Sequence, residues 1–407
     1  MPAPEPLRIL ADADVPLVDE ALARYGPVRV LPGAAIDRAA CRWADAVIVR
    51  SVTRVDASIL DDTRVRFVGT ATAGTDHLDE PYLAARAIRA ASAPGSNAES
   101  VVEWALAALL VLATRHGALA GRTLGVVGCG QVGARLITRA RAMGLDVLAC
   151  DPPLAEASDA AGVPHAFVSY ARLLEEADIL TYHTPLTFDG EHPTFHLLGA
   201  GALRASRRGV WVLNASRGAV VDGAALEAAL HIGHVAAAAI DVWEGEPAAP
   251  AALVARADLA TPHIAGYGYD AKVAGARAME DALRDWLRED GHALPPAFDW
   301  TAAAPAAAIE LAAPARQILH DAGVEAWLDA LAAGAYDIRA DDARFRASAL
   351  DAALDDAERS EDFSAQRRRY PVRRSWGFHR VAGTVPVELR RAVAEGLRMG
   401  SVGSSQP

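Results

Sequence analysis

A glycine pattern in the middle of the chain indicates a site for a dinucleotide cofactor. The run T-L-G-V-V-G-C-G-Q-V-G places Gly128, Gly130 and Gly133 in a G-x-G-x-x-G pattern that follows a predicted strand and opens a predicted helix. Such glycines permit a tight turn and let the backbone approach a pyrophosphate at the positive end of the helix. We expect Gln131 and Val132, in the first helical turn, to contact the cofactor through their backbone groups.

An acidic residue at the end of the next predicted strand favours NAD over NADP. Asp151 follows Gly133 by about 18 residues, a spacing at which an acid accepts hydrogen bonds from the ribose hydroxyls of adenosine. A carboxylate there would repel the extra phosphate of NADP. The alternative is a glycine-rich turn followed by an unrelated loop acid, but the strand, the helix and the spacing together favour NAD.

Three later segments each follow a predicted strand, at the sheet edge where open α/β folds bind ligands. They read N-A-S-R-G-A-V-V-D (214–222), D-V-W-E-G-E-P (241–247) and T-P-H-I-A-G-Y (261–267). Taken singly, Arg217 could be a surface ion-pair partner, Glu246 a loop acid and His263 a packed histidine. Their joint occurrence in a domain with a dinucleotide fingerprint favours one shared site.

The fingerprint and these segments together resemble the D-isomer-specific 2-hydroxyacid dehydrogenase family. The resemblance implies that Arg217, Glu246 and His263 form the catalytic set. A guanidinium fork suits a substrate carboxylate, and an imidazole that titrates near neutral pH can accept the C2 hydroxyl proton. A carboxylate beside that imidazole fixes its tautomer and favours its charged form. The implied activity is the NAD-dependent oxidation of a 2-hydroxy acid.

Further cofactor contacts follow from the same resemblance. The family has an acid near the nicotinamide at the position of Asp241, and its cofactor pocket is lined by the T-P-L segment that begins at Thr184. The other expected contacts are Ala215, Ser216, Arg217 and Gly266.

Segments near both ends of the chain narrow the resemblance to one branch of the family. They are V-R-S-V-T-R-V (49–55), G-T-A-T-A-G-T-D-H-L-D (69–79) and F-S-A-Q-R-R-R-Y-P-V-R-R (363–374). This branch oxidises 4-phospho-D-erythronate to 2-oxo-3-hydroxy-4-phosphobutanoate in pyridoxal 5'-phosphate (vitamin B6) biosynthesis. The resemblance implies that Ser51, Thr72 and Tyr267 contact the substrate.

Two features of these segments leave alternatives open. After Tyr267 the chain reads G-Y-D-A-K, where the family pattern has a hydroxyl residue and an acid–glycine pair. The arginine-rich stretch 367–374 either reaches the active site of a partner subunit or forms surface ion pairs.

These residues need a scaffold of parallel strands that end beside one another. Short apolar runs alternate with helical stretches from Leu7 to about Gly95, and a second series begins with a helix from Ser96 to about Arg115, which opens with a capping-box pattern of Ser96 and Glu99. The predicted class is α/β, a Rossmann-type NAD-binding domain with a flavodoxin-like substrate (lid) domain and a small C-terminal α+β dimerisation domain. The predicted bounds are 1–96 plus 267–290 for the substrate domain, 97–266 for the Rossmann domain, 291–385 for the dimerisation domain and 386–407 for a tail.

Composition excludes several classes of function. With 407 residues, 52% of them hydrophobic and 23% charged, the chain is typical of a globular protein. The longest apolar stretch, Trp104 to Ala113, is shorter than the roughly 20 residues that span a bilayer, so it predicts a buried helix and no membrane partner. No signal or transit segment is visible, which predicts a cytoplasmic protein. The net charge of −12 argues against nucleic acid.

The three cysteines and the family resemblance give the remaining expectations about disulfides, metals, oligomeric state and substrate. Cys41, Cys129 and Cys150 form no close pair and no metal-ligand spacing, so we expect buried thiols, no disulfide and no metal. The resemblance implies a homodimer that binds a small phosphorylated hydroxy acid.

Two alternative functions are weighed against this interpretation. One is another D-2-hydroxyacid dehydrogenase, acting on phosphoglycerate or glycerate; a regulatory domain with a β-α-β-β-α-β pattern would favour it, and the third segment lacks that pattern. The other is a non-catalytic NAD-sensing binding protein of the same fold. The complete set of Arg217, Glu246 and His263 disfavours the second.

Overall fold

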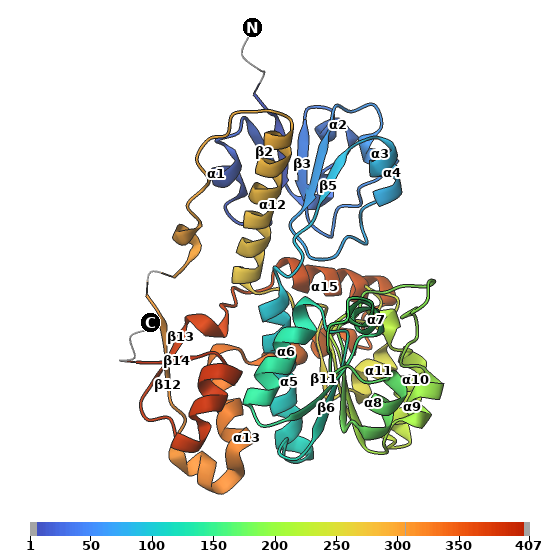
Figure 1. Ribbon diagram of the computed structural model, residues 1–407, viewed down its shortest axis with the longest axis vertical. Coiled ribbons are helices and arrows are strands. Elements are labelled where there is room, and N and C mark those ends of the chain that lie inside the picture. The colour runs from blue at the N-terminus through green and yellow to red at the C-terminus, as the bar shows by residue number, and fades with distance from the viewer. Residues whose placement is uncertain (1–5, 306, 403–407) are drawn as a thin grey trace. The chain divides into compact units, whose positions relative to one another are not determined.

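The computed structural model describes residues 6–305 and 307–402 of the chain (Figure 1). The chain divides into two compact units, one of residues 1–97 with 267–306 and the other of residues 98–266 with 307–407. Each unit is built on a parallel sheet of its own. The predicted α/β class is thereby confirmed.

The first unit has a five-stranded sheet in the order β2-β1-β3-β4-β5, which is the flavodoxin-like order. In Figure 1 the long helix α12 runs along this sheet. The strands are β1 (Ile9–Asp12), β2 (Val28–Leu31), β3 (Ala46–Val49), β4 (Phe67–Thr70) and β5 (Arg89–Ala91). The helices are α1 (Val18–Leu22), α2 (Arg38–Cys41), α3 (Ala57–Leu60), α4 (Glu80–Ala85) and α12 (Tyr269–Glu289).

Both faces of this sheet are covered, which explains why its strands are continuously apolar rather than alternating. Successive side chains of a strand point to opposite faces. Ile9 and Ile48 therefore pack with Met279 of α12 in one buried cluster, whereas Leu10 and Val47 belong to a second cluster on the other face.

The second unit has a six-stranded sheet in the order β11-β10-β9-β8-β6-β7. A lone bridge between Ala149 and Phe167 stands where a further strand of a Rossmann fold would lie beside β7. The strands are β6 (Thr123–Val127), β7 (Asp146–Cys150), β8 (Ile179–Tyr182), β9 (Val210–Asn214), β10 (Val235–Ile240) and β11 (Leu259–Ala260). The helices are α5 (Ala98–His116), α6 (Gln131–Ala142), α7 (Pro152–Ala160), α8 (Tyr170–Glu176), α9 (Ala200–Ala205), α10 (Gly223–His231) and α11 (Ala251–Arg256).

Helix α5 confirms the buried helix expected from the apolar stretch, but it begins differently from the prediction. Its residues from 100 to 113 are all buried, and Trp104 is fully enclosed. The helix begins at Ala98, so Ser96 lies two residues before it. The carboxylate of Glu99 binds Arg139 and Arg398 (2.9 and 2.8 Å) instead of closing a capping box with Ser96.

The C-terminal region, residues 307–402 of the described chain, adds helices and a small parallel sheet to the second unit. The strand order of this sheet is β12-β13-β14. Its helices α14 and α15 share the core of the larger sheet, because the ring of Phe345 lies 5.7 Å from the rings of both Trp243 and Phe363. The elements are β12 (Ile309–Ala312), α13 (Arg316–Ala335), α14 (Ile338–Ala349), α15 (Asp356–Arg368), β13 (His379–Ala382) and β14 (Gly400–Ser401).

Two predicted boundaries differ from the structure. Residues 291–305 belong with the first unit rather than with a third domain, because Glu280 of α12 accepts hydrogen bonds from the backbone of Phe298 and the ring of Trp300 (2.9 and 2.8 Å). The predicted tail 386–407 is folded through β14, whose strand pairs with β13; residues 403–407 lie outside the described part. The division into three domains stays a prediction.

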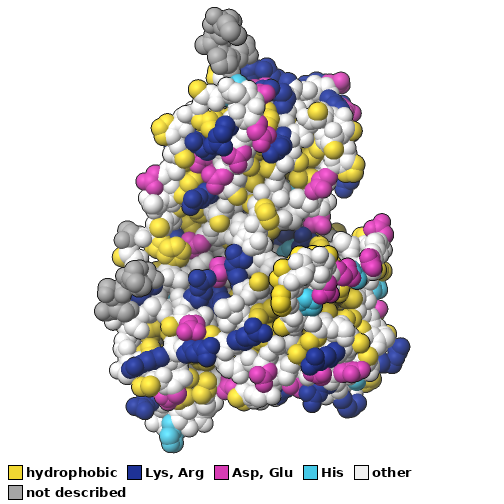
Figure 2. Space-filling view, viewed as in Figure 1, with side chains coloured by type: hydrophobic (Ala, Val, Ile, Leu, Met, Phe, Trp, Pro, Cys, Tyr) yellow, Lys and Arg dark blue, Asp and Glu magenta, His cyan; other side chains and the backbone are white. Residues whose placement is uncertain are grey.

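The surface gives two further observations. Among the described residues, no helix has both the length and the apolar character that crossing a membrane requires. On the face drawn in Figure 2, basic and acidic side chains are intermingled rather than gathered into one basic area. The expected absence of a nucleic-acid partner stays a prediction.

Candidate active site

The glycine fingerprint forms a tight turn between β6 and α6, as the sequence predicts. Gly128 has a φ of +85°, and its N–H donates to Cys150 O at 2.9 Å. A Cβ added to Gly133 would lie 2.0 Å from Gly128 O, so only glycine fits there. Around Gly130, the N-cap residue of α6, a Cβ would meet only open space. The turn therefore leaves room for a pyrophosphate at the helix N-terminus, where Gln131 and Val132 begin α6.

Asp151 stands at the end of β7, where the sequence places it. Its carboxylate accepts hydrogen bonds from Cys129 N–H at 2.7 Å and from Leu154 N–H at 3.1 Å, and so caps helix α7. Each carboxylate oxygen has two lone pairs, so this half-buried side chain retains acceptor capacity for a ribose hydroxyl. These backbone bonds also fix its direction.

Two enclosed polar atoms follow β8, the strand that pairs with β6, and lie next to the glycine turn. His183 Nδ1 and Thr184 Oγ1 are inaccessible to solvent and have no hydrogen-bond partner among the described residues. Enclosed polar atoms normally have a partner, so a ligand group is expected beside them. Burial lowers the pKa of His183 to about 4, which keeps this ring neutral near pH 7. The glycine turn, Asp151 and these two atoms fit a bound NAD.

The backbone of Arg217 is held by its neighbours after β9. Asn214 accepts from Ser216 N–H at 3.1 Å and donates to Arg217 O at 3.0 Å. The Arg217 guanidinium donates to Ser216 O at 2.9 Å. A Cβ on Gly218 would lie 2.1 Å from Trp243 O, so glycine lets this turn approach the loop that carries Glu246.

His263 and Glu246 form the acid–base pair that the sequence predicts. His263 Nδ1 lies 2.7 Å from Glu246 Oε2, and Glu246 Oε1 accepts from Trp243 N–H at 2.7 Å. Burial would raise the pKa of Glu246, but the charge and hydrogen bond of His263, the Trp243 N–H and the charge of Arg367 lower it overall. Because Nδ1 is committed to an ionised carboxylate, His263 Nε2 is the nitrogen that can exchange a proton with a substrate.

Asp241 has a structural task that the sequence does not reveal. Its carboxylate is fully buried and accepts from Thr261 Oγ1 and from the N–H groups of Ile264 and Ala265 (2.6, 2.8 and 2.9 Å). His263 N–H donates to Asp241 O at 2.6 Å. Asp241 thus shapes the loop around His263, and its expected contact with the cofactor stays a prediction, as do those of Ala215, Ser216 and Gly266.

The first unit contains the three expected substrate residues. Ser51 is exposed after β3, and Thr72 follows the adjacent strand β4, where its hydroxyl donates to Gly74 O at 3.0 Å. Tyr267 precedes α12, and Arg50 lies over its ring at 5.5 Å. Their contact with a substrate stays a prediction.

Lys272 is a residue that the sequence reasoning missed. Its ammonium lies 5.3 Å from the centre of the Tyr267 ring, so this ring has two cations beside it. Burial and the nearby charge of Arg50 lower the pKa of Lys272, and Asp14, 3.6 Å from Arg50, offsets part of this effect. The one sequence signal was the unusual G-Y-D-A-K segment, in which Lys272 is the final residue.

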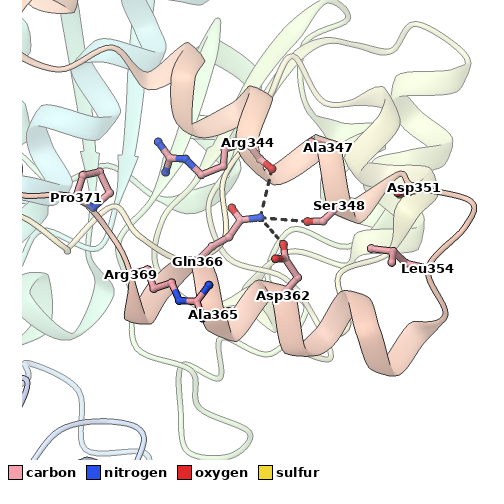
Figure 3. A pocket seen from close by; sticks show the side chains of 10 residues that line it. All are labelled: Arg344, Ala347, Ser348, Asp351, Leu354, Asp362, Ala365, Gln366, Arg369 and Pro371. Carbon is pink, nitrogen blue, oxygen red and sulfur yellow. Dashed lines mark hydrogen bonds between the residues drawn. The ribbon is translucent and has the colours of Figure 1, made fainter.

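The described residues also enclose an open cavity of about 660 Å³ between α14 and α15 (Figure 3). Gln366 points into it and donates to Arg344 O, Ser348 Oγ and Asp362 Oδ2 (3.3, 3.1 and 2.6 Å). None of the predicted site residues lines this cavity. We therefore place the active site at the carboxyl ends of the strands and not in this cavity. The lining residues are Arg344, Ala347, Ser348, Asp351, Leu354, Asp362, Ala365, Gln366, Arg369 and Pro371.

The remaining candidate ligands among the described residues are cysteines and two histidine–carboxylate clusters. Cys41, Cys129 and Cys150 are free and buried, as predicted. His196 forms a hydrogen bond with Glu244 at 2.9 Å and lies 3.8 Å from Asp222, and His192 forms a hydrogen bond with Glu156 at 2.7 Å beside Glu191. The expected absence of a metal stays a prediction.

Comparisons with known proteins agree with this geometry. Residues 104–265 match the family described as "D-isomer specific 2-hydroxyacid dehydrogenase, NAD binding domain", and residues 312–394 match a domain of unknown function (DUF3410). The chain is 47% identical to the erythronate-4-phosphate dehydrogenase of Salinibacter ruber, over 97% of this chain and 98% of that protein. It is 46% identical to the enzyme of the same name from Pseudomonas aeruginosa PAO1, over 95% and 98% of the two chains.

Solved structures share the fold. The TT0316 protein of Thermus thermophilus is 30% identical, with a TM-score of 0.60 over 72% of this chain and all of that one. The D-lactate dehydrogenase of Aquifex aeolicus, solved with NAD and lactic acid, is 23% identical, with a TM-score of 0.57 over 69% of this chain and 96% of that one, and so shows the fold alone. The chain belongs to the NAD-dependent D-isomer-specific 2-hydroxyacid dehydrogenase family, within the branch formed by the erythronate-4-phosphate dehydrogenases.

Proposed function

We propose that this chain oxidises 4-phospho-D-erythronate to 2-oxo-3-hydroxy-4-phosphobutanoate with NAD, a step of pyridoxal 5'-phosphate biosynthesis. The observation that carries the proposed chemistry is the 2.7 Å contact between His263 Nδ1 and Glu246 Oε2 on loops that follow strands of the cofactor-binding sheet. The relatives named above, which match along almost the whole chain, support the choice of substrate.

The protein residues divide the work of one oxidation. When bound, NAD would supply the acceptor for the hydride that leaves C2. Arg217 binds the substrate carboxylate through its planar fork and polarises the C2 oxygen. His263 Nε2 takes the proton from the C2 hydroxyl as the carbonyl forms, and Glu246 stabilises the resulting imidazolium. The C–H and O–H bonds break, one C=O bond forms, and one proton resides on His263.

The two cations beside Tyr267 support an anionic substrate. Arg50 and Lys272 belong to one unit and approach the same ring at 5.5 and 5.3 Å. Burial and then the charge of Arg50 lower the pKa of Lys272, and a phosphate dianion beside both cations would favour the charged form of Lys272. We propose that Arg50 and Lys272 bind the phosphate, whereas Ser51, Thr72 and Tyr267 contact the polyol chain.

A cytoplasmic homodimer is part of the proposal. The C-terminal region exposes the apolar side chains of Val372 and Val387 (73% and 70%), which a second copy could cover. Light scattering coupled to size exclusion should give twice the mass of the chain, and a monomeric mass at working concentration would contradict the dimer.

Substrate selectivity is the decisive test. Purified protein is assayed for NADH formation with 4-phospho-D-erythronate, 3-phosphoglycerate and D-lactate, with a 2-oxo acid present to reoxidise any retained cofactor. We expect the largest kcat/KM with 4-phospho-D-erythronate. Preference for another acid would keep the mechanism and overturn the substrate, whereas NAD binding without turnover of any acid would favour a sensing protein.

A further inference from the structure

The loop that carries His263 is held from outside the dinucleotide-binding fold. Asp342 Oδ1, on α14, accepts a hydrogen bond from Ala260 N–H at 2.7 Å. Arg373 Nη2, which follows α15, donates to Ala265 O at 2.6 Å. Residues of the C-terminal region therefore bind the backbone on both sides of the catalytic histidine.

Arg373 is buried and held by several contacts; it is not a surface residue. It is 5% exposed, and it also donates to Ser100 O at 3.3 Å, so it links the histidine loop to helix α5. Its guanidinium lies 4.2 Å from the centre of the Tyr336 ring. Tyr370, whose hydroxyl accepts a longer bond from Arg373 (3.4 Å), donates to Asp341 at 2.7 Å. These contacts fix the direction of the guanidinium.

Asp342 is fixed in a comparable way. Arg346 Nε donates to Asp342 Oδ1 at 2.7 Å, and Arg346 Nη2 donates to Ala257 O at 2.6 Å. The Asp342 side chain is only 14% exposed. The carboxylate that binds Ala260 is therefore anchored to the segment that enters β11.

The backbone of His263 explains why outside support matters. Its φ of +56° lies in the left-handed region, which is unfavourable for a residue with a side chain. Such conformations cost on the order of 1–3 kcal/mol and persist only where the surrounding structure holds them. Asp241 holds the loop from within the fold, at Ile264 and Ala265. The C-terminal contacts hold the same loop at Ala260 and at the carbonyl of Ala265.

We propose that Asp342 and Arg373 are positioning residues of the catalytic histidine in the same chain, and that holding the His263 loop is a function of the C-terminal region. They keep the peptide groups on either side of His263 in place, so that its Nε2 meets the substrate hydroxyl in productive geometry. Displacements of about 1 Å at a reacting group can lower the rate about 100-fold. The inference rests on the catalytic role of His263 proposed above.

A pair of substitutions at one position tests the role of Arg373. In Arg373→Met, we expect kcat to fall about 10- to 100-fold, while the KM for the hydroxy acid and the Kd for NAD change less than about threefold. Arg373→Lys retains a donor for Ala265 O and should recover a large part of kcat. Arg391→Met, which removes an exposed arginine bound to Glu395, is the matched control and should behave as wild type.

Two further measurements keep the test decisive if Arg373→Met folds poorly. Asp342→Ala removes the acceptor of Ala260 N–H, whereas Asp342→Asn retains it, so only the alanine variant should lose turnover. Amide hydrogen exchange across residues 260–266 should be faster in Arg373→Met and Asp342→Ala than in the control.

The outcomes separate this inference from the proposed function. Unchanged kcat in folded Arg373→Met and Asp342→Ala, or equal losses of kcat and NAD affinity, would overturn the positioning role. Unchanged amide exchange across the loop would do the same. If the wild-type protein turned over no hydroxy acid, the proposed function would fail, yet the exchange data would still report whether the loop is held.

Discussion

The two units use the same kind of scaffold for different chemistry. Both have parallel sheets whose loops at the carboxyl ends of the strands carry the candidate site residues. In the unit of residues 98–266 these loops carry a histidine–carboxylate pair, His263 and Glu246. In the other unit Arg50, directly after β3, and Lys272, in the first turn of α12, lie beside the ring of Tyr267.

The difference shows that a shared type of scaffold does not determine which function the residues at its strand ends perform. A paired imidazole can move a proton, whereas fixed cations can only bind and orient an anion. If the comparison is correct, substitutions of His263 and Glu246 should act on kcat, and those of Arg50 and Lys272 should act on KM. Four predictions follow, from the largest expected effect to the smallest; the first three test this division, and the fourth tests the burial of His183 in the second unit.

Loss of the imidazole should have the largest effect. His263→Asn removes the group that accepts the C2 hydroxyl proton, and general acid–base catalysis of this kind is typically worth 10²- to 10⁴-fold, so we expect kcat to fall about 1000-fold. The Kd for NAD, measured by fluorescence titration, should stay within about threefold of wild type. His320→Asn, an exposed histidine bound to Asp321, is the control. A comparable loss of NAD affinity would contradict the assignment.

Neutralising the carboxylate should have an intermediate effect. Glu246→Gln keeps an acceptor for Trp243 N–H but removes the charge that stabilises the His263 imidazolium. We expect kcat to fall about 10- to 100-fold. The check is kcat measured with saturating 4-phospho-D-erythronate and NAD. An unchanged kcat would show that Glu246 does not assist His263.

Removing a cation from the first unit should act on binding alone. Lys272→Met should raise the KM for 4-phospho-D-erythronate about 10-fold, equivalent to about 1.4 kcal/mol of binding, with little change in kcat. The KM for the same acid without its phosphate should not change. Arg277→Met on the same helix removes an exposed arginine 3.9 Å from Asp281 and is the control. Equal effects on both acids would remove Lys272 from the phosphate site.

The smallest effect concerns stability rather than turnover. Burial lowers the pKa of His183 to about 4, below the value of about 6.5 expected in the unfolded chain. As the pH falls from 6.5 towards 4, His183 binds a proton in the unfolded state but not in the folded state. The free energy of unfolding therefore decreases by at most about 1.4 kcal/mol per pH unit. Urea unfolding without NAD should show a shallower pH slope in His183→Gln. An unchanged slope would mean that His183 is protonated in the fold.

Sequence alone predicted the parts of this protein that depend on neighbouring residues. The glycine turn and the apolar strands are local patterns, and the structure has them where they were expected. The support of the catalytic loop is different, because the Asp342–Ala260 and Arg373–Ala265 contacts join residues 82 and 108 positions apart. The contact of Asp241 with the cofactor stays a prediction, but its hydrogen bonds to the backbone amides of Ile264 and Ala265 were not expected from the sequence. Side-chain direction of this kind depends on tertiary packing, which no spacing rule encodes.

The aromatic contact of Phe345 with Trp243 and Phe363 limits how far this enzyme can be trimmed. The solved relatives described above match about 70% of the chain, which suggests a shorter minimal enzyme to a protein engineer. Deleting the C-terminal region would instead expose the Trp243 ring and the apolar surface around it to water, which would favour aggregation. The C-terminal region is thus not a detachable module, and chimeras with shorter dehydrogenases must replace Trp243 and its neighbours together with it.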